Sequence, residues 1–99
     1  MDQIDLLSRV WTLTEAIEHA AAIADWPTAA SLAEQRSPLL MSVSGCQSSD
    51  AMAVINRIRA TDAVIMANAE LTRRELQAEF QEALRYSNAA HQYQQVALI

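Results

Sequence analysis

A long segment without glycine or proline, from Ala51 to Tyr93, limits what this chain can fold into more than any other feature. Its apolar and small side chains recur at spacings of three and four residues, the period at which an α-helix returns to one face. We therefore predict one long helix over about residues 50–95. The alternative is a break near residues 68–72, where a weak capping-box pattern starts at Thr72. The stripe consists of Ile55, Ile58, Asp62, Ile65, Ala69, Thr72, Leu76, Phe80, Ala83, Ser87 and Ala90.

Two further helical patterns precede this segment. The stripe of the first consists of Ile4, Leu7, Val10, Trp11, Thr14, Ile17, Ala21 and Ala24, and it predicts a helix over about residues 2–24. Pro27 ends that pattern, because a proline pushes the residue before it out of the α region but fits the first turn of a new helix. We therefore expect a second helix over about residues 27–43. Pro38 leaves two alternatives open, a kinked helix or a break at residues 35–37.

The serine-rich segment between the second and third helices holds Gly45, the one glycine of the chain. Glycine is favoured just after the end of a helix, whereas serine and aspartate are favoured at the start of one. We expect Gly45 to end the second helix, and Ser49 or Asp50 to cap the third.

The composition favours the all-α class as well. The chain has one glycine and two prolines among 99 residues, fewer turn residues than a strand-rich protein needs. It is rich in alanine, glutamine, glutamate, leucine and arginine, which are strong helix formers. We predict a single helical domain over residues 1–99, built as an antiparallel three-helix bundle with a long third helix.

The expected helices differ greatly in length. At 1.5 Å per residue the first spans about 33 Å, the second about 24 Å and the third about 65 Å. The two shorter helices therefore cover only the first half of the third. From about Glu75 onward, the third helix keeps apolar side chains that its neighbours do not reach. An exposed apolar stripe of this kind typically marks an interaction surface.

Charge and composition exclude several classes of function. The net charge of −5, with no basic stripe, disfavours nucleic acids and anionic lipid surfaces as partners. No apolar run reaches the roughly 20 residues that a membrane helix needs. The acidic N-terminus lacks the basic start of a signal peptide, so we expect a cytoplasmic protein without membrane insertion.

The sequence predicts neither an enzyme nor a metal or cofactor site. A single glycine excludes the common phosphate-binding loops, and His19 and His91 lie in different predicted helices, outside zinc motifs. We interpret Glu15, Glu18 and His19 as a solvated helix face. We interpret Cys46 as a thiol without a catalytic role.

Asp62 lies on the apolar stripe of the third helix and leaves two interpretations open. One is a boundary residue paired with Arg9, Arg36 or Arg59, because buried carboxylates are normally paired. The other is a polar contact with a partner.

A set of residues spread over most of the chain suggests a family. It comprises the turn Ala24-Asp25-Trp26, then Leu32, Arg36 and Leu39-Leu40, and on the third helix Ile55, Ile58, Asp62, Ile65 and Arg73-Arg74. With these residues the chain resembles the FliT-type flagellar export chaperones. The resemblance implies a small cytoplasmic helical protein that keeps the flagellar filament-cap protein monomeric before secretion. It also implies delivery to the export ATPase apparatus, and in some relatives binding to the flagellar master transcription regulator.

We therefore predict a chaperone that buries a helix of its substrate against apolar positions of the second and third helices. The expected contact residues are Leu32, Leu40, Ile65, Leu76, Phe80 and Leu84. For the first three, a place in the ordinary core is the other interpretation. The alternative function is a structural adaptor, in which the uncovered stripe pairs with a second copy to form a homodimer.

Overall fold

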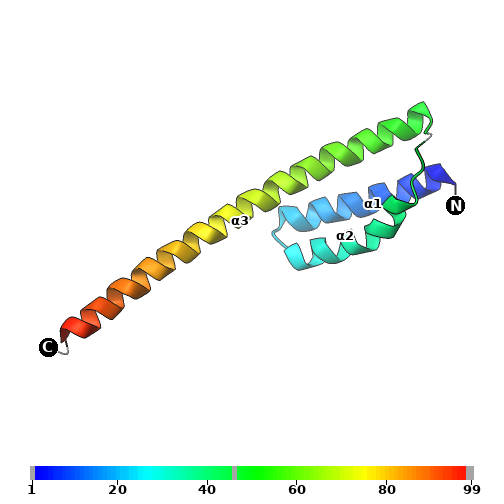
Figure 1. Cartoon of the computed structure of the whole chain (residues 1–99). Helices are drawn as coiled ribbons and strands as arrows, with labels where there is room; N and C mark the ends of the chain where they lie inside the picture. The colour runs from blue at the N-terminus through cyan, green and yellow to red at the C-terminus, as the bar shows by residue number, and fades with distance from the viewer. Residues whose placement is uncertain (1, 46, 98–99) are drawn as a thin grey trace. The chain divides into compact units, whose positions relative to one another are not determined.

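The computed structural model describes residues 2–45 and 47–97, and this part of the chain forms three helices without any strand (Figure 1). Helix α1 covers Gln3–Ala22, α2 covers Trp26–Met41 and α3 covers Ser49–Ala97. The predicted all-α class is confirmed, and each helix begins and ends within two residues of its expected range. The chain divides into two units, Met1–Ala69 and Glu70–Ile99. The single domain over residues 1–99 stays a prediction.

The first unit is a three-helix bundle made of α1, α2 and the part of α3 up to residue 69, as expected from the sequence. In Figure 1, α2 runs back along α1. Two clusters of buried side chains hold the unit together. The first contains Leu7, Val10, Ala51 and Ile58, with Trp11, Leu39, Val43, Val54 and Ile55 packed against it. The second contains Ile17, Ala20 and Ala29, with Trp26, Leu32, Ala33 and Ile65 packed against it.

The corner between α1 and α2 forms through backbone hydrogen bonds at the end of α1. Ala24 adopts a left-handed conformation with φ 59°, and the N–H of Asp25 donates to the carbonyl of Ala20 at 2.8 Å. The Asp25 carboxylate then accepts from the N–H of Thr28 at 3.3 Å and caps α2. This pattern is a Schellman-type helix end followed directly by an N-cap, which explains why the corner needs only a few residues.

Two open alternatives from the sequence are settled in favour of continuous helices. Pro38 lies inside α2, so the helix passes through residues 35–37 without a break. In the turn that follows the proline, the Ser42 hydroxyl donates to the Pro38 carbonyl at 3.0 Å. Helix α3 likewise runs through residues 68–72.

The expected caps between α2 and α3 were wrong. Helix α2 ends at Met41, four residues before Gly45, and no glycine among the described residues has a positive φ. The cap of α3 is Ser48 and not Ser49 or Asp50, because the Ser48 hydroxyl accepts from the N–H of Ala51 at 3.2 Å. Several adjacent serines offer equivalent caps, so the sequence pattern alone does not choose among them.

The second unit consists of the part of α3 from residue 70 onward, and its apolar side chains are exposed. The exposed fractions are 54% for Leu71, 59% for Leu76, 61% for Phe80 and 42% for Leu84. Tyr86 and Tyr93, two turns apart, flank a shallow hollow over Ala89 and Ala90. Within the described residues, no helix is both long enough and apolar enough to cross a membrane.

Candidate binding groove

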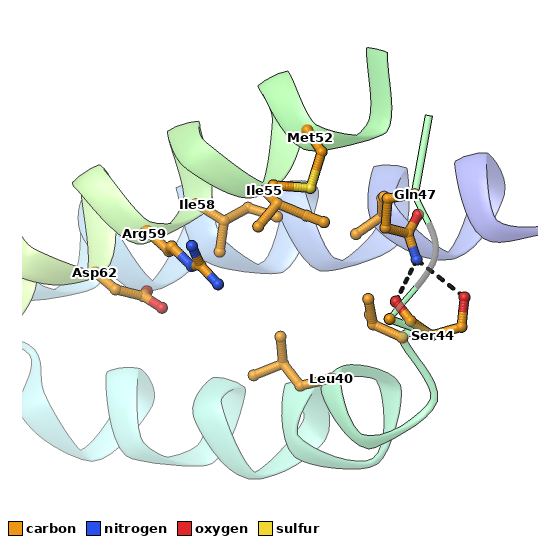
Figure 2. A pocket seen from close by; sticks show the side chains of 11 residues that line it. Leu40, Ser44, Gln47, Met52, Ile55, Ile58, Arg59 and Asp62 are labelled. Carbon is orange, nitrogen blue, oxygen red and sulfur yellow. Dashed lines mark hydrogen bonds between the residues drawn. The ribbon is translucent and has the colours of Figure 1, made fainter. Parts of the chain in front are cut away.

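The first unit contains a groove between α2 and α3, with a cavity of about 480 Å³ (Figure 2). It is lined by Leu7, Leu40, Val43, Ser44, Gly45, Gln47, Met52, Ile55, Ile58, Arg59 and Asp62. Helix α3 packs against α1 through Ala51 and Ile58, which join Leu7 and Val10 in the first core cluster. The hollow lies between the helices, and its lining includes Leu7 of α1, Leu40 of α2 and Ile58 of α3.

The bottom of the groove is apolar and its sides are partly exposed. Leu7 and Ile58 are almost fully buried, with exposed fractions of 2% and 5%. Leu40 of α2 and Met52 of α3 are more open, with exposed fractions of 40% and 38%. In Figure 2, Leu40 points from α2 toward Ile58 and Ile55 of α3 across the open space. A second apolar surface laid into this groove would bury side chains that water now reaches.

One end of the groove is closed by an amide network. The side-chain NH₂ of Gln47 donates to the Ser44 carbonyl at 2.6 Å and to the Gln3 side-chain oxygen at 3.0 Å. The same Gln3 oxygen accepts from the N–H of Ser44 at 3.1 Å. Gln3 at the start of α1 thus ties the connecting segment to the bundle and fixes this end of the groove.

The other end is charged and rests on a polar network across the three helices. Arg36 of α2 donates to Asp62 of α3 at 2.7 Å and to the hydroxyl of Thr14 of α1 at 3.0 Å. The Thr14 hydroxyl, which is fully buried, donates in turn to the Val10 carbonyl at 2.7 Å. Asp62 is therefore the boundary residue of the first interpretation, and its partner is Arg36. Arg59 lies one turn before Asp62 and also lines the groove.

The predicted contact residues fall into three places. Leu40 lines the groove. Leu32 and Ile65 are half-buried and pack together against the second core cluster, so the structure brings these two into the core. The remaining three, Leu76, Phe80 and Leu84, lie exposed in the second unit.

Sequence reasoning missed several residues of the groove, chiefly Met52, Arg59 and Gln47. A signal for the first two was present, because Met52, Ile55, Arg59 and Asp62 follow one another at spacings of three, four and three. Such spacing places them on one helix face. Gln47 lies outside the helices and carries no periodic signal.

The other residues considered from the sequence do not extend the site. Glu15, Glu18 and His19 are exposed on α1. Among the described residues, no group of three or more His, Cys, Asp or Glu side chains is placed to hold a metal ion. Cys46 lies outside the described residues. The groove is thus an apolar channel with one amide end and one charged end, which suits binding of a peptide segment.

Comparisons with known proteins give one finding. Residues 4–95 match the model of the protein family described as "Flagellar protein FliT". The comparisons with curated proteins and with solved structures yield no match.

Proposed function

The chain belongs to the FliT family of flagellar export chaperones, and from this premise we propose that it binds the flagellar filament-cap protein, or a similar export substrate, and keeps it competent for secretion. The family acts by binding proteins and not by catalysis. In this proposal the protein works in the cytoplasm, before its substrate enters the export apparatus.

The groove between α2 and α3 is the observation that carries the proposal. Its apolar bottom, with Leu7 and Ile58, lies beneath the half-open side chains of Leu40 and Met52. An amphipathic helix binds to such a channel by laying its apolar face into it, with anchors at helical spacing. Burial of that apolar area supplies the driving force, at about 25 cal/mol per Å² before the costs of association.

The second unit offers a further contact surface in this proposal. Leu76, Phe80 and Leu84 lie within eight residues of one another on α3 and are exposed. Their spacing of four residues places them along one side of the helix. We assign them to a second segment of the substrate, apart from the segment in the groove.

Binding of the purified protein to the filament-cap protein of the same bacterium tests the proposal, with the dissociation constant measured by calorimetry. The variant Leu40→Glu places a charge in the apolar groove and should weaken binding at least about tenfold. Met41→Glu is the matched control, because Met41 is the next residue on α2, is 85% exposed and does not line the groove. It should bind like the unchanged protein. Equal effects of the two variants, or no binding by the unchanged protein, would contradict the proposal.

Two further partners belong to the same proposal, the export ATPase components and the flagellar transcription regulator. The exposed residues Leu76, Phe80 and Leu84 also favour a second candidate, a homodimer that pairs the second units. Light scattering separates the two assignments of this surface. A tight dimer that Phe80→Ser dissociates would assign the surface to a second copy instead of a substrate.

A further inference from the structure

We propose that Arg59 makes the groove selective for partner helices that carry an aspartate or glutamate beside their apolar face. This inference rests on the proposed function, since it concerns what the groove between α2 and α3 accepts. The partner contributes an acidic side chain, and Arg59 is the residue that binds it.

The position of Arg59 supports this role. Met52, Ile55 and Arg59 follow one another at spacings of three and four residues, so α3 presents two apolar side chains and then a cation along one face. All three line the cavity. Figure 2 shows the Arg59 side chain directed into the space between α3 and α2, on the side of Leu40.

The charge of Arg59 lacks a partner in the described part of the chain. The other charged residue that lines the groove is Asp62, and its Oδ1 lies 2.7 Å from Nη1 of Arg36. The remaining ion pairs among the described residues join Glu70 to Arg73 and Arg74. The groove therefore presents an unpaired positive charge at its polar end.

Selection follows from what an incoming helix does to that charge. A helix in the groove covers Arg59 and removes water from its guanidinium, which is unfavourable unless a partner replaces the water. A carboxylate replaces it with charge-assisted hydrogen bonds, and a lysine adds repulsion. The whole chain has a net charge of −5, so general attraction favours cationic partners. A preference for acidic residues must therefore come from a local site.

The spacing along α3 fixes where the acidic residue lies. Arg59 is seven residues beyond Met52, which corresponds to about 10 Å along the helix axis. A partner helix that anchors an apolar side chain between Met52 and Leu40 should therefore carry its carboxylate about two turns away, on the same side.

A displayed library of 18-residue helices, with a fixed apolar face and all other positions random, tests the inference. The library is selected on the full-length protein and on the variants R59Q, R59E, Arg85→Glu and Leu40→Glu. On the unchanged protein, acidic residues should be enriched over basic ones about three- to tenfold at one position, about two turns from an apolar anchor. R59Q should abolish this preference and R59E should reverse it. Arg85→Glu, which changes the net charge equally but lies outside the groove, should leave it intact.

The outcomes separate this inference from the proposed function. Acidic enrichment that persists with R59E, or that disappears equally with Arg85→Glu, overturns the role of Arg59. Helices that bind the unchanged protein but not Leu40→Glu, and show no acidic preference, overturn that role while the groove remains the binding site. If no helix binds, or if Leu40→Glu selects the same helices, both proposals fail. Circular dichroism confirms that each variant is folded.

Discussion

Arg36 is the side chain at which the three helices of the first unit meet. Its side chain is only 13% exposed, and its Nη1 donates to both Asp62 and Thr14. A buried guanidinium is favourable only while its partners are present, so losing the partner costs more than losing the charge itself. Asp62 is 35% exposed, which reduces the expected effect below that of a fully buried pair.

This asymmetry predicts the order of two variants. Asp62→Asn leaves the buried Arg36 without its counter-ion and should lower the free energy of unfolding by about 1–2 kcal/mol. Arg36→Met removes the charge but keeps an apolar side chain of similar length, and should lower it less. Urea denaturation measures both, and the double variant should be more stable than Asp62→Asn alone. An Arg36→Met variant less stable than Asp62→Asn would show that the other contacts of Arg36, including its hydrogen bond to Thr14, outweigh the cost of the stranded charge.

Gly45 gives a second prediction at the residue scale. Its φ is not positive, and a Cβ added to its backbone meets no atom within 4 Å. Gly45→Ala should therefore stabilise the protein by about 0.4–1 kcal/mol, because alanine reduces the entropy of the unfolded chain. A shift of the denaturation midpoint to higher urea checks this. A loss of stability would mean that the connecting segment needs a conformation that only glycine adopts.

Among the elements, α3 shows how far periodicity predicts a helix. Its long stripe predicted a continuous helix correctly, because the absence of glycine and proline leaves little that ends one. Pro38 was harder to interpret, since a proline removes one hydrogen bond but does not always stop a helix. The cap at Ser48 was missed because Ser48 and Ser49 differ only in backbone conformation, which the sequence pattern does not contain.

Glu70 forms ion pairs with Arg73 and Arg74 at the start of the second unit. Hydrogen bonds from Arg73 lower the pKa of the Glu70 carboxyl below its ordinary value of 4.5, with further help from the charges of Arg73 and Arg74. Arg73 binds both carboxylate oxygens, at 2.8 and 3.1 Å. Because the folded pKa is lowered, this stabilisation is present above pH 4.5 and is lost as the pH falls through the lowered value.

An NMR titration of the Glu70 carboxyl checks this cluster. The pKa should lie below 4.5 in the unchanged protein and should return toward 4.5 in Arg73→Ala. Arg85→Ala, a change of equal charge elsewhere on α3, should leave the pKa of Glu70 where it was. A Glu70 pKa that is insensitive to Arg73→Ala would refute the hydrogen bonds as its cause.

For the whole molecule, every buried side chain among the described residues lies in the first unit, from Leu6 to Ile58. A chain shortened to residues 1–69 should therefore fold, with a free energy of unfolding within about 1 kcal/mol of the full chain. Circular dichroism against urea measures this, and the helical signal should fall by the share that residues 70–97 contribute. A shortened chain without cooperative unfolding would show that the second unit supplies part of the core.

The groove is lined by residues of all three helices and of the segment between α2 and α3, so little of it could be predicted from the sequence. Periodicity identifies the face of a helix, and Leu40 was identified in this way. It does not give the distance between helices, on which the cavity between α2 and α3 depends. Leu32 on α2 and Ile65 on α3 were identified from helical periodicity in the same way as Leu40, yet they pack against the core.

The aromatic residues are divided between the two units in a way that experiments can use. Trp11 and Trp26 lie in the first unit, where the Arg57 guanidinium stacks 4.5 Å from the Trp11 ring, and Tyr86 and Tyr93 lie in the second. Selective excitation of indole therefore gives emission from the bundle alone, whereas the phenol rings are fluorophores of the other unit. A change in indole emission therefore reports on the first unit, and a change in phenol emission reports on the second, without any added label.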